Sequence, residues 1–299
     1  GAPSLLINGR FFRAFGTFGQ PNPFGGFMGL LIPLVLMLLL AYLRRIYHQY
    51  QAGQRLSVIQ VIPAATYGLS SVLMIAAIFA SWSRGAWLGL IIALGVMLFV
   101  LPRKLWQSIL LAGTLCILVA TMWTAGLLPQ SVTARIASST EEFFIFDDVR
   151  GVTITPENYA VVERLAHWQA ALNMTREHPW LGVGLGNYEI VYEQYRLMAW
   201  QPPLGHAHNY YLNIFAEAGL FGLLSYLFLW SGMFYITWRA RQHPDFMMRY
   251  LCIGLLGTWT YLMVHSLLDN LYVNNIFLHL GVLIGLVLLV YQQISSTEQ

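Results

Sequence analysis

Charged side chains are scarce in this 299-residue chain, where Asp, Glu, Lys and Arg make up 10% of the residues and hydrophobic residues make up 57%. A soluble domain carries about 25% charged residues, so this composition excludes an ordinary soluble protein. The mean hydropathy of +0.59 points the same way. The net charge of +3 is slight, and we therefore expect no nucleic-acid binding and a chain that crosses a membrane several times.

Cysteine is equally scarce. Cys116 and Cys252 are the only two, and both lie in apolar runs, where a small buried thiol is the usual state. Two such cysteines predict neither a disulfide nor a metal framework. The chain also has no convincing internal repeat and no low-complexity tract.

Long apolar runs are abundant, and each approaches the length of about 20 residues that crosses a bilayer as a helix. The seven runs are Phe24–Leu43, Val58–Ala80, Trp87–Leu101, Trp106–Ala125, Tyr210–Trp238, Tyr250–Leu268 and Ile276–Tyr291. They lack the strict alternation of barrel strands. The sequence predicts an all-α membrane protein, with four membrane helices in residues 1–125, a long external loop in residues 126–209 that contains amphipathic helices, and three membrane helices in residues 210–299.

Basic residues mark every second short connection between these runs. They are Arg44, Arg45, Arg55, Arg103, Lys104, Arg239, Arg241 and Arg249. The positive-inside rule places these connections in the cytoplasm and the long loop on the outer face, since long translocated loops are exempt from the rule. The chain begins Gly-Ala-Pro without a signal-peptide pattern, so we expect it to be the C-terminal part of a longer protein.

One helix is predicted within the long loop. Thr155-Pro156-Glu157 is a typical helix start, and His178-Pro179 ends the pattern. Apolar residues recur between them at three- and four-residue spacing, at Val161, Leu165, Trp168 and Leu172. We expect this helix to lie on the outer membrane surface. Arg164, four residues before Trp168, would then face an anion at the interface or snorkel past the apolar stripe.

Other polar residues gather near the predicted outer face. Arg84 is the only charge on the short turn between the second and third runs, and a cation at that depth is a functional candidate. His206 and His208 flank Ala207 at the end of the long loop. Because no third ligand is evident, we expect no metal site. His208 is either a proton acceptor or an interfacial histidine bonded to the backbone.

Glycines punctuate two further segments. Those in Gly182–Asn187 follow a helix and a proline rather than a strand, which excludes a dinucleotide-binding loop and predicts a turn where backbone approaches a neighbour. Glu217 precedes Gly219 and Gly222, whose small size indicates close helix packing. We expect Glu217 to be a structural hydrogen-bond partner rather than a catalytic group. The aromatic residues of the loop form either a sugar-stacking wall or an interfacial belt. They are Tyr188, Tyr192, Tyr195 and Trp200.

An ordered set of short motifs resembles the O-antigen ligase and polymerase family. The motifs are Arg13-Ala14-Phe15-Gly16-Thr17-Phe18-Gly19-Gln20-Pro21-Asn22, Ser83-Arg84-Gly85, Arg164-x3-Trp168, His178-Pro179-Trp180-Leu181-Gly182-Val183-Gly184, His206-Ala207-His208-Asn209 and Glu217-x-Gly219-x2-Gly222. Their order and spacing match the family over nearly all of the chain. Members usually have more membrane spans, which supports the expectation of missing N-terminal helices.

The resemblance implies a GT-C-like, inverting glycosyltransferase of the bacterial inner membrane that uses neither a metal nor another cofactor. It implies as donor a glycan on undecaprenyl diphosphate, and as acceptor a hydroxyl of lipid A-core, a growing polysaccharide or a protein at the periplasmic face. The essential arginines and histidine of family ligases correspond to Arg84, Arg164 and His208. The further substrate-binding residues that we expect are His206, Asn209, Glu217, Trp168 and Tyr211.

These roles agree with the chemistry of the residues. Arg84 and Arg164 would bind the diphosphate as guanidinium forks, and His208 would deprotonate the acceptor. The form His-Ala-His-Asn departs from the ligase pattern and is common among polymerases and protein O-oligosaccharyltransferases, so the acceptor stays open, with a ligase favoured.

Two other classes compete with an enzyme. A transporter or flippase of polysaccharide or lipid-linked glycan would place ionisable groups near the bilayer midplane. Only Glu217, His265 and His279 interrupt the apolar runs in this way. A receptor or assembly scaffold would bind a partner through the loop without any reaction.

Overall fold

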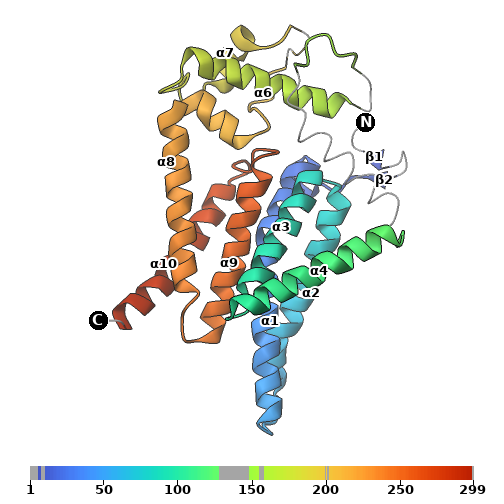
Figure 1. Cartoon of the computed structure of the whole chain (residues 1–299), viewed down its shortest axis with the longest axis vertical. Coiled ribbons are helices and arrows are strands. Elements are labelled where there is room, and N and C mark those ends of the chain that lie inside the picture. The colour runs from blue at the N-terminus through green and yellow to red at the C-terminus, as the bar shows by residue number, and fades with distance from the viewer. Residues whose placement is uncertain are drawn as a thin grey trace. The chain divides into compact units, whose positions relative to one another are not determined.

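The computed structural model describes residues 6–7, 11–127, 148–154, 158–198, 200 and 202–297. Over these residues the chain is almost entirely helical (Figure 1). Besides the helices and the loops between them, these residues form a small antiparallel ribbon of β1 (Leu6–Ile7) and β2 (Phe11–Phe12) and a 3-10 turn, η2 (Gly16–Phe18). The predicted all-α membrane class is therefore confirmed.

All seven predicted apolar runs form helices, because uninterrupted apolar sequence satisfies its backbone polar groups only in this way within lipid. The helices are α1 (Pro21–Gln51), α2 (Val58–Ser81), α3 (Arg84–Val100), α4 (Leu105–Thr124), α8 (Tyr210–Ala240), α9 (Phe246–His265) and α10 (Ile276–Thr297). Within the described residues, α1, α2, α8, α9 and α10 are long and apolar enough to cross a membrane, and α3 is shorter. This is a multi-pass membrane protein, while the total of seven spans stays a prediction.

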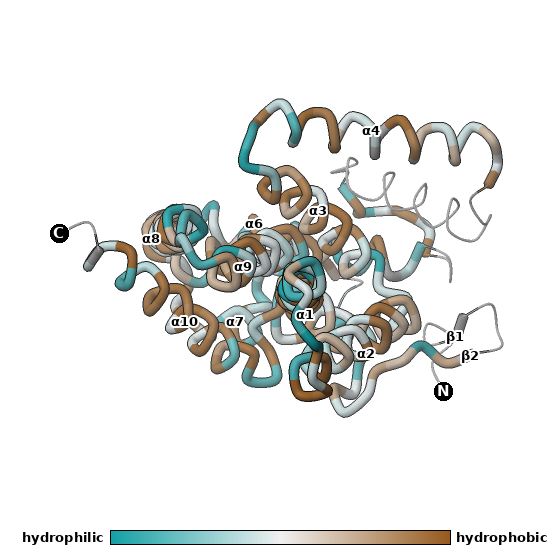
Figure 2. Tube along the Cα trace, turned by 90° about the horizontal axis from the view of Figure 1, so that it is seen from below, coloured by the Kyte–Doolittle hydropathy of each residue, from teal (hydrophilic) through white to brown (hydrophobic). Residues whose placement is uncertain are grey.

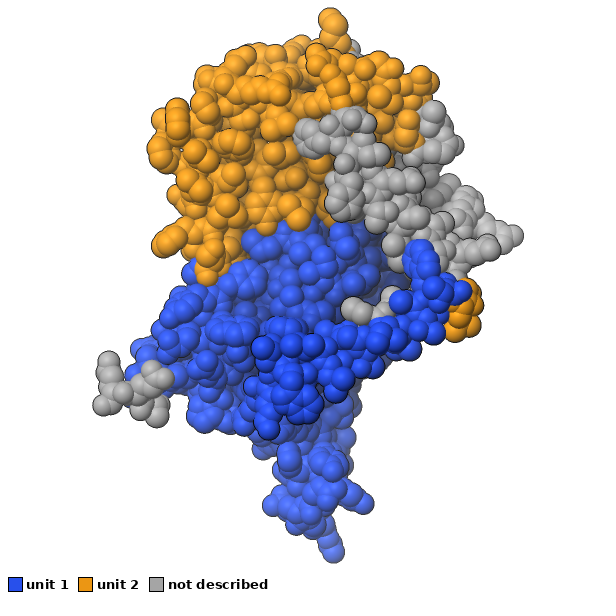
Figure 3. Space-filling view, in the orientation of Figure 1, with its two compact units in different colours: residues 1–124, 232–265, 271–299 blue, residues 125–231, 266–270 orange. Residues whose placement is uncertain are grey.

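The chain divides into two compact units (Figure 3). Unit 1 contains Gly1–Thr124, Gly232–His265 and Leu271–Gln299. Unit 2 contains Ala125–Ser231 and Ser266–Asn270, including α6 (Tyr159–Glu177) and α7 (Tyr188–Tyr195). A short segment after α9 thus belongs with the long loop, although it is distant in sequence.

Helix α9 is the central helix of unit 1. In the most apolar stretch of α9, 72% of the residues are buried, whereas 17% of the residues are buried in the corresponding stretch of α2. Helices α1 and α3 pack against it through glycines, because a Cβ at Gly29 or Gly89 would crowd the Tyr261 ring. The Tyr261 hydroxyl donates to the Gly25 carbonyl at 3.1 Å. Large apolar side chains on α2 and α10 stay exposed, and Figure 2 shows apolar residues along the membrane helices, as expected of lipid-facing surfaces.

Unit 2 has a packed core in which α6 is central. The predicted end of this helix before His178 is confirmed, whereas its predicted start at Thr155–Glu157 lies outside the described residues. The predicted apolar stripe is wrong in register. The buried positions are Val162, Leu165, Ala166, His167, Ala170, Ala171, Met174 and Thr175, and Val161, Trp168 and Leu172 are only half-buried.

Close approach of neighbouring rings explains this shift. Ala170, Ala171 and Met174 form one cluster with Tyr188 and Tyr192, and the small alanines leave room for those rings. Tyr188, Tyr192 and Trp200 are buried. They are therefore core residues, and the prediction of an interfacial belt or an open sugar-stacking wall is wrong for these three. This core buries one side of α6 within unit 2, and the location of the helix at the membrane surface stays a prediction.

Cys252 is buried and unpaired in α9, as predicted, and the Cys116 side chain lies outside the described ones. In unit 1, Cys252 packs with Ala240 and Val290. This agrees with a small hydrophobic role for the thiol.

Candidate active site

The loop before α8 holds its histidines in a fixed backbone conformation. Leu204, Gly205 and His208 have positive φ angles of 50°, 75° and 52°. For a residue with a Cβ this conformation costs on the order of 1 kcal/mol or more, and such strain concentrates at functional sites. The Ala207 N–H donates to Asn213 Oδ1 at 3.0 Å, so α8 itself fixes the loop.

Asn209 begins α8. Its Oδ1 accepts the backbone N–H groups of Tyr211 at 3.0 Å and Leu212 at 3.1 Å, which is the geometry of an N-cap. Helix α8 is further tied to the segment after α9, because the Tyr210 N–H donates to the Ser266 carbonyl at 2.8 Å. Asn209 thus has a structural task, and its expected contact with substrate stays a prediction.

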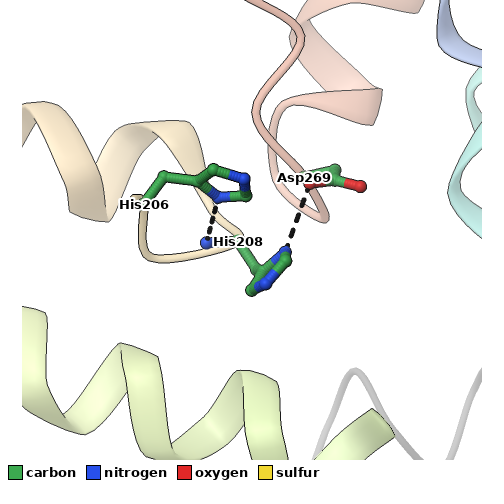
Figure 4. Close-up of side chains that lie close together, drawn as sticks. All are labelled: His206, His208 and Asp269. Atoms are coloured by element: carbon green, nitrogen blue, oxygen red, sulfur yellow. Dashed lines mark hydrogen bonds and ion pairs between the residues drawn. The ribbon is translucent and has the colours of Figure 1, made fainter. Parts of the chain in front are cut away.

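His208 and Asp269 form a pair (Figure 4). The His208 Nδ1 atom lies 3.3 Å from Asp269 Oδ1, and the two side chains are 18% and 10% exposed. The His208 Nε2 atom is buried and has no hydrogen-bond partner among the described residues. A carboxylate at Nδ1 favours the tautomer with the proton on that nitrogen, which leaves a lone pair on Nε2. This is the arrangement of a general base, rather than of a histidine bonded to backbone.

His206 holds the backbone of the loop, whereas His208 has the arrangement of a base. The His206 Nδ1 atom accepts the His208 backbone N–H at 3.1 Å, and the two rings lie 4.4 Å apart (Figure 4). Burial, followed by the charge of His208, lowers the pKa of His206 to about 4. His206 is therefore neutral at pH 7.

Asp269 is ionised in this setting. Burial raises its pKa, but the hydrogen bond with His208 and the electrostatic interactions with His208, His206 and Arg164 outweigh that effect and hold the pKa below its usual range. Arg164 lies on the half-buried side of α6 and acts on both His206 and Asp269. Arg164 and His208 thus lie in the same unit, and their convergence on one substrate stays a prediction.

Asp269 was missed by the sequence reasoning, which expected no third ligand beside the histidine pair. His206, His208 and Asp269 each offer one ligand atom, and these atoms lie within 4.8 Å of one another, so the group could hold a metal ion. However, His208 Nδ1 and His206 Nδ1 already take part in hydrogen bonds within the group. The positive charge of Arg164 also disfavours a second cation there. The expectation of metal independence stays a prediction.

His167 and Tyr192 continue the cluster into the core. The His167 ring stacks on Tyr192 with centroids 4.8 Å apart, and lies edge-on to His208 at 5.8 Å. Its Nδ1 contacts the Tyr188 hydroxyl at 3.1 Å. Burial, and then the charges of His208 and His206, lower the pKa of His167 to about 3. The Tyr192 hydroxyl is buried and has no partner among the described residues.

The two glycine motifs meet in unit 2. The Val183 N–H donates to the Ala216 carbonyl at 2.9 Å, and the Gly184 N–H donates to the Glu217 carbonyl at 2.8 Å. A Cβ at Gly182 would collide with the backbone of Ala216 and Glu217, which confirms the predicted close backbone approach.

Gly219 makes the matching approach from α8. Its φ of 64° and ψ of −165° interrupt the helix, and a Cβ there would collide with Trp180 and Leu181. The predicted close packing at Gly219 is therefore against a loop rather than another helix. Glu217 Oε1 accepts the Tyr188 N–H at 3.0 Å at the start of α7, the expected structural role. The expected contact of Glu217 with substrate stays a prediction.

Trp168 and Tyr211 were also expected to bind substrate. Trp168 is half-buried and packs against the cluster of Val149, Val162, Leu165, Ala166 and Trp200. Tyr211 is half-buried, with its ring 5.8 Å from that of Tyr226. Both contacts are packing contacts, and a role in binding stays a prediction.

Arg84 is the first residue of α3, in unit 1. The turn before it is tied to the N-terminal motif, because Arg13 Nε donates to the Ser81 carbonyl at 2.8 Å. Arg13 Nη2 donates to Asn22 Oδ1 at 2.9 Å. The N-terminal motif Arg13–Asn22 and the motif Ser83-Arg84-Gly85, two of the six motifs typical of the family, therefore lie close together. The convergence of Arg84 with Arg164 and His208 stays a prediction.

The sequence of this chain is similar to known proteins of one family. The profile of the O-antigen ligase family matches residues 69–227, more than half of the chain. An O-antigen ligase of Pseudomonas aeruginosa is 30% identical over 112 residues, which are 37% of this chain and 24% of that protein. The chain thus matches about a quarter of the length of this relative. On the extent of the profile match, the chain belongs to the O-antigen ligase family.

Proposed function

We propose that this protein transfers a glycan from undecaprenyl diphosphate to an acceptor hydroxyl at the periplasmic face of the bacterial inner membrane, as an inverting ligase. The family supports a glycan-transfer role of the ligase or polymerase type. The observation that carries the finer proposal is the unpartnered, buried Nε2 atom of His208, with Asp269 at the opposite ring nitrogen.

In the proposed reaction His208 Nε2 takes the proton of the acceptor hydroxyl. The acceptor oxygen forms a bond to the anomeric carbon as the bond from that carbon to the diphosphate oxygen breaks, which inverts the configuration. The undecaprenyl diphosphate leaves with the electron pair. Asp269 stabilises the imidazolium that forms at His208, because the pair is largely removed from water.

Arg164 and Arg84 complete the proposal as diphosphate ligands. A diphosphate is already a good leaving group, so matching its charge matters more than protonating it. Guanidinium forks bind phosphate oxygens in pairs and stay charged at any relevant pH. Arg164 already acts on the Asp269 and His206 side of the site. We propose that Arg84 supplies the second fork.

The test is transfer by the purified full chain in liposomes with a lipid-diphosphate glycan and a panel of acceptors. We expect transfer to survive a chelator, and His208→Ala to lower the rate by about 10² to 10⁴. Loss of transfer with the chelator and its recovery with a divalent cation would instead assign a metal to His206, His208 and Asp269.

The diphosphate ligands are tested separately. Arg164→Lys and Arg84→Lys keep the charge but lose the fork, so each should weaken donor binding or turnover. If both bind one diphosphate, the double variant should lose less than the product of the two single losses. Arg176→Gln, on the exposed last turn of the same helix as Arg164, is the matched control and should stay near wild type.

The acceptor panel separates the remaining alternatives. Transfer to lipid A-core identifies a ligase, elongation of the donor glycan identifies a polymerase, and transfer to a protein identifies an O-oligosaccharyltransferase. Glycan that crosses the vesicle membrane without transfer would indicate a transporter. Binding without transfer or crossing would indicate a scaffold.

A further inference from the structure

A group of arginines lies at one end of unit 1, outside the proposed active site. We call Arg44, Arg103, Arg241 and Arg249 the arginine cluster. Arg249, in the first turn of α9, is 6% exposed, and its Nη2 donates to the Leu101 carbonyl at 2.8 Å. The charges of Arg103 and Arg44 act on Arg249, and the charge of Arg249 acts on Arg241. The cluster thus draws on α1, α9 and the connections after α3 and α8.

Among the described residues, no carboxylate neutralises the charge of the arginine cluster. Over the part of the chain that the structure describes, none of its four members forms an ion pair. Asp245, the acidic residue next to α9, accepts the backbone N–H groups of Met247 and Met248 with Oδ1 and so caps the helix. The Arg241 Nε atom is buried without a hydrogen-bond partner. Like charges gathered around a buried guanidinium repel one another, so an anion that joins them is favoured.

The surroundings indicate which kind of anion fits. Arg44 Nη1 donates to the Tyr250 hydroxyl at 3.1 Å, and Arg241 Cζ lies 3.6 Å from the centroid of the Trp238 ring. Aromatic rings at helix ends are typical of the membrane–water interface, where phospholipid phosphates lie. Guanidinium groups bind phosphate oxygens bidentately.

We propose that the arginine cluster binds the phosphate of an anionic phospholipid at the membrane face that the basic connections assign to the cytoplasm. Basic pockets between membrane helices on this side bind lipid head groups in the same way. A buried apolar cluster of Met37, Ala41, Met97, Val100, Tyr250, Ile253 and Leu256 packs α1, α3 and α9 together, and its Tyr250 accepts the hydrogen bond from Arg44.

The experiment measures thermal unfolding of the full chain in neutral detergent, with phosphatidylglycerol, phosphatidylcholine or inorganic phosphate added. Phosphatidylglycerol alone should raise the Tm of the wild type, by about 3 °C or more at saturation. The rise should be lost in Arg249→Gln. Because a variant at this buried position can fail to fold, Arg103→Gln and Arg241→Gln are measured as well, and each should reduce the rise by at least half.

Arg45→Gln is the matched control. Arg45 is an exposed neighbour of Arg44 on α1, and this substitution removes one positive charge from the same end of the helix. It should keep the full rise in Tm. An equal rise with inorganic phosphate would show a site for free phosphate, and an equal rise with phosphatidylcholine would show a general lipid effect. No rise at all would show that the arginines are only solvated. Each of these three outcomes overturns the proposal.

Discussion

Replacing Asp269 with Asn is the sharpest test of the proposed base, because it removes a charge while keeping the size of the side chain. Asp269 Oδ1 and His208 Nδ1 lie 3.3 Å apart, with the two side chains 10% and 18% exposed. At an effective dielectric constant of about 20, unit charges at this separation interact by about 5 kcal/mol. An Asn amide retains part of the hydrogen bond, so we expect a loss of about 2 to 4 kcal/mol in the stabilisation of the transition state.

This loss corresponds to a fall in kcat of about 30- to 1000-fold, below the full loss expected for His208→Ala. The assay is transfer in liposomes over a range of pH and donor concentration. The KM for the donor should change little, because Asp269 acts through His208 and does not contact the substrate.

Asp148→Asn is the control in the same unit. Asp148 pairs with Arg150 at the surface, with side chains 49% and 74% exposed, and an exposed pair of this kind contributes little. If a folded Asp269→Asn protein kept more than half of the wild-type kcat, the assignment of His208 as a base positioned by Asp269 would be refuted.

Three further predictions concern the surroundings of the base. Tyr192→Phe should leave the Tm level or raise it, because the buried Tyr192 hydroxyl has no partner among the described residues, whereas Tyr188→Phe removes a satisfied hydroxyl and should lower the Tm in the same thermal unfolding measurement. Gly219→Ala should lower Tm far more than Gly186→Ala, since both positions have positive φ but only the former is enclosed by backbone, as calorimetry of the purified variants would show. Burial lowers the pKa of His167 to about 3, so the unfolded chain binds a proton at His167 more tightly than the folded chain does. The free energy of unfolding should therefore fall steadily as the pH drops from 6.5 toward 3. A free energy of unfolding that is flat over this window would contradict the burial of His167.

The membrane helices were predictable because lipid leaves a chain little choice. An apolar run must form a helix to pair its backbone groups, and each predicted run does so. The fine structure of α6 was less accessible. The pattern of large apolar residues favoured Val161, Trp168 and Leu172, whereas the buried face is centred on Ala166 and Ala170. Small residues carry a weak hydrophobic signal, yet they mark the places where a neighbouring ring comes closest.

The candidate site shows the same division between local and long-range information. His206 and His208 were visible as a motif because only Ala207 separates them, but Asp269 lies 61 residues from its partner His208. The sequence places Asp269 in a turn on the predicted outer face and offers no register that pairs it with either histidine. That pairing depends on α8 starting beside the end of α9, where the Tyr210 N–H meets the Ser266 carbonyl.

The break in α8 has a further consequence for this pairing. Gly219 interrupts the helix so that the loop at Trp180 and Leu181 packs against its backbone, and the Gly184 N–H reaches the Glu217 carbonyl at 2.8 Å. Glu217 in turn holds the start of α7, which carries Tyr188 and Tyr192 against His167. Residues that touch no substrate in the proposed mechanism therefore determine the walls around His208. A change at Gly219 should disturb transfer through the position of α7, even though the His208–Asp269 pair itself is made by other segments.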